Sequence, residues 1–141
     1  MRTLYGLAIA SMIVAAIGSA QAEVRRFTIE LNGTQEQPAV VTEGRGTARM
    51  TLDTTTRRLT WNVTYRGLSG PATMAHIHGP ALPGENAPVL INLAPQGMKN
   101  PLTGSAELTE AQMADLLAGK TYVNVHTEQH KAGEIRGQIY P

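Results

Sequence analysis

Four histidines are the side chains of this chain best suited to binding a metal ion. They fall in two short segments, with His76 and His78 in the first and His126 and His130 in the second. Side chains two residues apart on a β-strand point to the same face, so His76 and His78 project together if their segment is a strand. Two imidazoles on one face, joined by a third from a neighbouring strand, could form a metal site.

The second segment shows the same alternation. Val123 and Val125 form its apolar pair, so His126 faces away from them. If these valines and the isoleucine between the first two histidines point into the core, the histidines of both segments lie on the outer surface of a barrel. His130 follows four residues later in a turn, from which it could reach back as an additional ligand.

The last alternating segment places a positive charge near this group. Residues 134–140 carry isoleucines on one face and Arg136 on the other. If this strand lies beside that of His126, Arg136 shares the histidines' face, where it could attract an anionic substrate and donate hydrogen bonds to it. An ion pair of Arg136 with Glu128 or Glu134 is the alternative.

The ligand type indicates the metal. Neutral imidazole suits copper and zinc, and the affinity order favours Cu²⁺ at an equivalent site, so we expect one copper ion, with zinc less favoured. Three imidazoles leave a position open for a small ligand, as oxygen-species chemistry requires. Met74 shares the face of His76, and we expect it to pack rather than to act as an axial ligand. A solvated surface pair is the alternative for His76 and His78.

The elements that must position these residues are short strands. Eight segments carry alternating or β-branched residues between turns rich in Gly, Pro and Asn. They are residues 24–31, 46–53, 58–66, 72–79, 89–93, 102–107, 120–127 and 134–140. Thr109 and Gln112 form a capping box that opens one short helix, and Gly119 ends it. The pattern predicts an all-β fold, an antiparallel Greek-key barrel or sandwich of about eight strands with one short helix.

Composition excludes several classes of function. The chain has 12 Lys and Arg against 11 Asp and Glu, a formal net charge of +1, which argues against nucleic acid and anionic lipid as partners. It has no cysteine, which excludes thiol catalysis, iron–sulfur clusters, blue-copper sites and cysteine-type zinc sites.

The first 22 residues have the pattern of a signal peptide. Arg2 precedes an apolar run over residues 4–17, and Ala20-Gln21-Ala22 provides the small residues that signal peptidase requires. The run is shorter than the roughly 20 residues that cross a bilayer. We therefore expect cleavage after Ala22, a bacterial periplasmic or secreted location without a membrane anchor, and one domain over residues 23–141.

Several motifs together resemble those of the CHRD domain, which is named for its repeats in chordin. They are H-I-H-G-P at residues 76–80, the helix that opens after Leu108, G-K-T-Y-V-N-V-H-T at residues 119–127, and G-E-I-R-G-Q at residues 133–138. The resemblance covers residues 23–141. It implies an architecture similar to the Greek-key barrel of copper/zinc superoxide dismutases, copper held by His76, His78 and His126, and an anion-guiding role for Arg136.

The sequence also departs from these patterns. The family commonly has a Pro- and Gly-rich turn where this chain has His130-Lys131-Ala132, so His130 is either an additional ligand or an exposed side chain. We find no counterpart of the bridging histidine, the zinc-site aspartate or the disulfide of the copper/zinc enzymes. A second metal is therefore not expected.

Three functions fit these observations. The favoured one is a copper-dependent superoxide dismutase that converts superoxide to oxygen and hydrogen peroxide at a mononuclear site. The second is a periplasmic copper-binding protein with the same ligands and no turnover. The third is an extracellular structural or interaction module in which the histidines are incidental. A hydrolytic zinc site is chemically possible, but no general base stands out beside the histidines.

Overall fold

The strands of the protein follow the alternation of its sequence. The computed structural model describes residues 23–141, so the predicted signal peptide lies outside the described residues. β1 (Val24–Asn32), β2 (Arg45–Asp53) and β3 (Arg58–Arg66) each turn every second side chain over much of their length toward the interior. The remaining elements are η1 (Gly33–Gln35), β4 (Ala72–His78), β5 (Val89–Asn92), β6 (Leu102–Glu107), α1 (Glu110–Leu117), β7 (Thr121–Thr127) and β8 (Ile135–Ile139).

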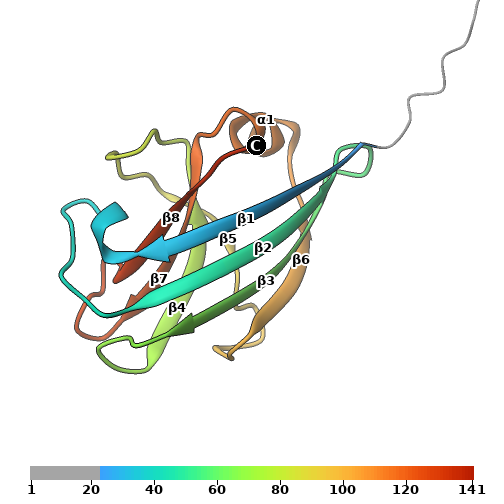
Figure 1. Cartoon of the computed structure of the whole chain (residues 1–141). Helices are drawn as coiled ribbons and strands as arrows, with labels where there is room; N and C mark the ends of the chain where they lie inside the picture. Colours follow the sequence, from blue (N-terminus) through green and yellow to red (C-terminus); the bar gives the residue numbers. More distant parts are fainter. Residues whose placement is uncertain (1–22) are drawn as a thin grey trace, which may run out of the picture.

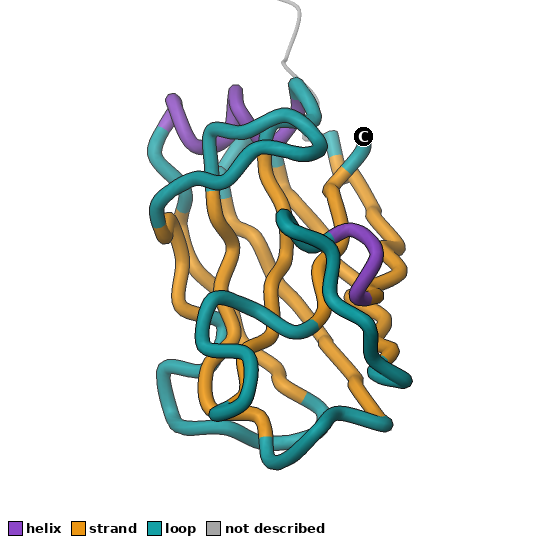
Figure 2. Tube along the Cα trace, turned by 90° about the vertical axis from the view of Figure 1, so that its left-hand side faces the viewer, coloured by secondary structure: helices purple, strands orange, loops and turns teal. Residues whose placement is uncertain are grey.

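Within the described residues, eight antiparallel strands form one nearly closed, barrel-like sheet in the order β5-β4-β7-β8-β1-β2-β3-β6. β4 lies beside β7, and β8 beside β1, although these strands are distant in the chain, as is typical of Greek-key connections. Figure 1 shows the strands around the barrel, and Figure 2 shows loops at its two ends and further loops that run across its side. The predicted fold class is confirmed, and each predicted strand differs from the observed one by no more than one residue at either end.

The core illustrates why the strands pair in this register. Phe27, Met50 and Trp61 are successive partners across β1, β2 and β3, and all three are buried. The indole N–H of Trp61 donates to the carbonyl of Leu93 over 3.0 Å, which satisfies the one polar atom that this side chain brings inside. Gly104 of β6 is the next partner of Trp61, and a Cβ at this position would lie 2.6 Å from Cζ2 of the indole. A glycine is therefore required there.

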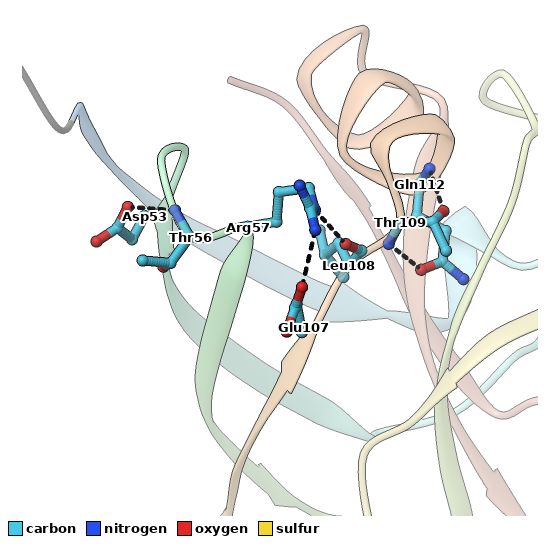
Figure 3. Close-up of polar contacts among 7 residues, drawn as sticks. All are labelled: Asp53, Thr56, Arg57, Glu107, Leu108, Thr109 and Gln112. Atoms are coloured by element: carbon cyan, nitrogen blue, oxygen red, sulfur yellow. Dashed lines mark hydrogen bonds and ion pairs between the residues drawn. The ribbon is translucent and has the colours of Figure 1, made fainter. Parts of the chain in front are cut away.

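The short helix begins and ends where the sequence predicts. The Thr109 side chain accepts from the backbone N–H of Gln112, and the Gln112 side chain accepts from the backbone N–H of Thr109 (Figure 3). This capping box satisfies two N–H groups that the first turn leaves free. Gly119 follows the last turn with φ of 73°, a left-handed conformation that glycine adopts without strain.

The hairpin between β2 and β3 is tied to the segment that precedes the helix (Figure 3). The carboxylate of Asp53 accepts from the backbone N–H of Thr56 over 3.0 Å and so closes the turn. Arg57 then donates through Nε to the carbonyl of Leu108 over 3.0 Å and through Nη2 to Glu107 over 2.8 Å. These contacts close one end of the barrel on the side of β3 and β6.

At the other end of the barrel, a buried carboxylate joins three segments that are distant in sequence. Glu134 accepts hydrogen bonds from the hydroxyl of Thr42 at 2.6 Å, the hydroxyl of Ser69 at 2.6 Å and the hydroxyl of Thr127 at 2.7 Å. The backbone N–H of Ser69 adds a fourth bond at 2.8 Å. Glu134 thus anchors the loops after η1 and β3 to the strand that carries His126.

Candidate metal centre

Two neighbouring strands bring three of the four histidines together. In the β4–β7 ladder, Met74 pairs with His126 and His76 pairs with Asn124. Because the side chains on one face of an antiparallel pair are close neighbours, His76 and His78 of β4 meet His126 of β7. The ligand atoms of these three histidines all lie within 4.8 Å of one another. The predicted convergence of two distant segments is therefore confirmed.

The three rings lie close together and are inclined to one another by 46° to 80°. The ring centroids of His76 and His126 are 5.0 Å apart, and those of His76 and His78 are 5.5 Å apart. Nδ1 of His76 lies 3.1 Å from Nε2 of His126. Nδ1 of His76 and Nε2 of His126 are thus the nitrogens that these two rings present to each other.

Backbone carbonyls fix the protonation of two of the rings. Nδ1 of His78 donates to the carbonyl of Ala87 over 2.9 Å, and Nδ1 of His126 donates to the carbonyl of Lys131 over 2.8 Å. A carbonyl can only accept, so in the neutral ring each Nδ1 carries the hydrogen and each Nε2 keeps its lone pair. Such support behind a ligating imidazole is typical of metal sites, where it orients the ring.

The unsatisfied nitrogen of His78 shows whether the three histidines fit a metal ion. Nε2 of His78 is buried and has no hydrogen-bond partner among the described residues. Buried polar atoms rarely lack a partner, so an orphaned one requires an explanation. A lone pair on this atom, facing the ligand atoms of His76 and His126, is what a copper or zinc ion would engage. The donor set therefore fits a mononuclear metal ion.

The same surroundings keep the three rings neutral. Burial, followed by the proximity of His126 and of His78, lowers the pKa of His76 to about 4. Burial also lowers the pKa of His78 and of His126, although the hydrogen bonds to the carbonyls of Ala87 and Lys131 act in the opposite direction. Neutral imidazoles are the form that binds metal, so the site needs little deprotonation before an ion enters.

The predicted exposure of the histidines is wrong. They do lie on the outer face of the sheet, opposite the core residues Ile77 and Val125. That face is covered, however, because His78 is only 9% and His126 only 5% exposed. The covering segments are the loop 79–88 and the turn 128–133, which supply the two carbonyls behind the rings. Of the three converging histidines, only His76 is partly exposed, so the open side of the site is next to it.

His130 is not brought to this group. It lies outside the three histidines whose ligand atoms converge, and its partly buried side chain lines a separate pocket with Val41, Glu43 and Ser69. Its backbone belongs to a tight turn, in which its carbonyl accepts from the N–H of Gly133 at 3.0 Å. The turn that was expected to carry His130 back to the site instead directs the Lys131 carbonyl there.

Arg136 shares the histidines' face, as predicted, but it is not on the open surface. It pairs with Asn124 in the β7–β8 ladder and is 1% exposed. Its guanidinium donates to Asn86 over 3.2 Å and to Gln138 over 3.5 Å, and its Cζ lies 3.4 Å from the ring centroid of Tyr122. It forms no ion pair with Glu128 or Glu134 in the described part of the chain. Arg136 is therefore a buried charge held beside the site.

Three residues that the sequence did not single out complete the surroundings. Tyr122 stacks on His78, and Asn124 donates through Nδ2 to the carboxylate of Glu36. Burial raises the pKa of Glu36 to about 7, against the opposing effects of the Asn124 hydrogen bond and the Arg136 charge. Side chains alternate along a strand, so Tyr122 and Asn124 lie on the same face as His126. This alternation could have indicated both residues from the sequence. No local signal indicated Glu36.

The family follows from comparison with known domains. The family model of the CHRD domain matches residues 27–139, which include every strand of the barrel except the first three residues of β1. The chain belongs to the CHRD domain family. All three converging histidines and Arg136 fall within the matched CHRD region. No curated protein and no solved structure matches the chain. Within residues 23–141, no helix of this CHRD domain is long and apolar enough to cross a membrane.

Proposed function

We propose that this CHRD-family protein is a copper-dependent superoxide dismutase with one ion held by His76, His78 and His126. The observation that carries the proposal is the convergence of three neutral imidazoles, one with a buried and unpartnered Nε2. Nitrogen ligands favour copper over zinc at an equivalent site. Copper, when bound, supplies a one-electron couple, so that one superoxide is oxidised to oxygen while a second takes up the electron and two protons to form hydrogen peroxide.

The protein itself positions the ligands and restricts access to the metal site. The carbonyls of Ala87 and Lys131 fix two of the rings before any ion arrives, which reduces the reorganisation that binding requires. The covering loops bury His78 and His126 and leave access on the side of His76.

Arg136 contributes its charge rather than a free guanidinium. It is buried, its hydrogen bonds are to neutral partners, and it packs on the ring of Tyr122 that also stacks on His78. A positive charge in a poorly screened position attracts an anion over a short range. We assign Arg136 the role of drawing superoxide toward the metal through this local field.

Export completes the proposal. The signal-peptide pattern of residues 1–22 supports action in the periplasm or outside the cell, after cleavage at Ala22. The small net charge argues against nucleic acid as the partner and gives no global attraction for an anion, so any attraction of superoxide must be local.

The test loads the purified protein with copper and measures both metal stoichiometry and the rate of superoxide removal. We expect one copper per chain, with superoxide removal that is lost in His76→Ala and His126→Ala. His130→Ala is the matched control and should keep both the metal and the activity. Stoichiometric copper without superoxide removal would indicate a copper-binding protein instead. If the protein binds no stoichiometric metal, the structural or interaction module is the function that remains.

A further inference from the structure

Met74 lies beside the three histidines in an unusual position for a large apolar side chain. It is 46% exposed, so the predicted packing role is wrong. The other methionines of the described residues are buried in the core, as is Met50, or pack against it, as do Met98 and Met113. Met74 is thus the described methionine that the core leaves free.

The strand register places Met74 next to two of the ligands. It is the direct partner of His126 across the β4–β7 ladder, and it lies two residues before His76 on the same face of β4. Directly opposed residues have Cβ atoms about 5 Å apart, which is within reach of a methionine side chain. The ladder is regular from Met74 to His78 and shifts only between Ala72 and Met74. Met74 is therefore the last residue that the regular pairing aligns with the histidine face.

Its side of the site is also the open one. His78 and His126 are covered by loops, whereas His76 is partly exposed, and Met74 continues the strand past His76 toward more exposed residues. An ion that enters from solvent on this side passes the methionine. A methionine side chain has three rotatable bonds, so it can follow an ion inward.

Thioether chemistry determines which ion this residue serves. Methionine sulfur is a soft, uncharged ligand that selects Cu(I), whereas imidazole accepts Cu(I), Cu(II) and zinc alike. We propose that Met74 is a fourth ligand specific to monovalent copper, which takes up Cu(I) at the open edge and holds it together with the three histidines. This inference rests on the proposed copper site and adds a preference for the reduced ion over zinc and Cu(II).

The experiment compares Met74→Leu with the unaltered protein, since leucine keeps an apolar side chain of similar size and removes the sulfur. Met98→Leu, which removes a sulfur that packs against the core, is the matched control. Cu(I) affinity is measured without oxygen by competition with a colorimetric Cu(I) chelator, and Cu(II) affinity by competition with an amino-acid chelator. X-ray absorption at the copper edge reports whether sulfur lies in the first coordination shell.

We expect Met74→Leu to weaken Cu(I) binding by about tenfold or more, the scale at which losing a supporting group affects metal sites. Cu(II) binding should change by less than about twofold, because the oxidised ion gains little from a thioether. The sulfur neighbour should be present in the Cu(I)-loaded protein, absent in Met74→Leu and retained in Met98→Leu.

Two results would overturn the inference in different ways. If copper binds stoichiometrically and depends on His76 but shows no sulfur neighbour, or if Cu(I) affinity is the same in Met74→Leu, the role of Met74 is wrong and the proposed site stands. If the protein binds no copper, or binds it equally well in His76→Ala, the proposed site fails and the inference fails with it.

Discussion

The rings of His78 and Tyr122 stack almost in parallel, with centroids 5.0 Å apart and planes inclined by 4°. The same tyrosine ring lies against the guanidinium of Arg136, and its hydroxyl accepts from the backbone N–H of Ala87 over 3.2 Å. Ala87 in turn supplies the carbonyl that binds His78. Tyr122 therefore holds one ligand, the loop behind that ligand and the nearby charge in a single arrangement.

Tyr122→Leu should weaken copper binding by about tenfold, because His78 loses the flat surface that orients it. It should also lower the free energy of unfolding by roughly 2 kcal/mol through lost packing. Tyr122→Phe keeps the stacked ring and removes only the hydroxyl, so its copper affinity should stay close to that of the unaltered protein. Competition titration and urea denaturation measure the two quantities. Equal copper affinity in all three proteins would show that the stack does not position the ligand.

Arg136→Met keeps most of the side-chain volume and removes the charge. We expect superoxide removal to slow by roughly tenfold at low salt, the lower end of electrostatic rate effects. The difference in rate between Arg136→Met and the unaltered protein should decrease as ionic strength rises, because salt screens the attraction of the anion. Copper stoichiometry is the control and should not change. A slowing that is the same at all ionic strengths would argue that Arg136 acts by packing on Tyr122 and not by attraction.

Local alternation accounts for how much of this site could be predicted. Residues 72–79 and 120–127 show the period of two on their own, so the common face of His76 and His78 and the outward direction of His126 followed from the sequence. That their strands are neighbours depends on the order of the whole sheet. Spacing alone does not determine that order, and the resemblance to a known family was what indicated it.

The surroundings of the histidines could not be predicted in the same way. Ala87 and Lys131 act through backbone carbonyls, which every residue has, so no residue type marks them in advance. Glu36 reaches Asn124 from a loop 88 residues earlier in the chain. The exposure of the site was mistaken for the same reason: loops that cover the sheet carry no periodicity. His130 was misplaced because the turn that contains it closes on itself.

Glu134 should make the fold less stable as the pH falls. Burial alone would raise its pKa, but the hydrogen bonds from Ser69, Thr42 and Thr127 outweigh burial and lower the pKa from 4.5 to about 2. A depressed carboxyl pKa stabilises the folded state above the unfolded value, and this contribution is lost as pH falls from about 4.5 to about 2. Glu134→Gln should therefore unfold more easily by roughly 2 kcal/mol at pH 7.

The pH dependence separates this effect from a general loss of packing. Urea denaturation of both proteins should show the difference between them shrinking as pH falls through the same range. A difference that stays constant down to about pH 2 would mean that the charge of Glu134 contributes nothing. Glu107→Gln is a matched control, because that carboxylate is exposed and pairs with Arg57 at the surface.

Glu36 should make the stability of the fold depend on pH in the opposite direction. Burial raises its pKa from 4.5 to about 7, so the folded state binds a proton that the unfolded state has released between these values. Stability should therefore fall as pH rises from about 4.5 to about 7 and then level off. Glu36→Gln, which resembles the protonated carboxyl, should match the unaltered protein near pH 4 and exceed it by roughly 2 kcal/mol at pH 8. Denaturation curves that show no gain at pH 8 would refute the assignment.

The carbonyls behind His78 and His126 also determine the charge of the centre. None of the three imidazoles is anionic, and neither Ala87 nor Lys131 places a carboxylate against them, so a bound cation keeps its entire formal charge, with Arg136 nearby. The oxidised ion then draws an incoming anion more strongly than the reduced ion does. If the proposed copper site turns over, the two halves of its cycle would be electrostatically unequal, and encounter with the reduced form would be the slower of the two.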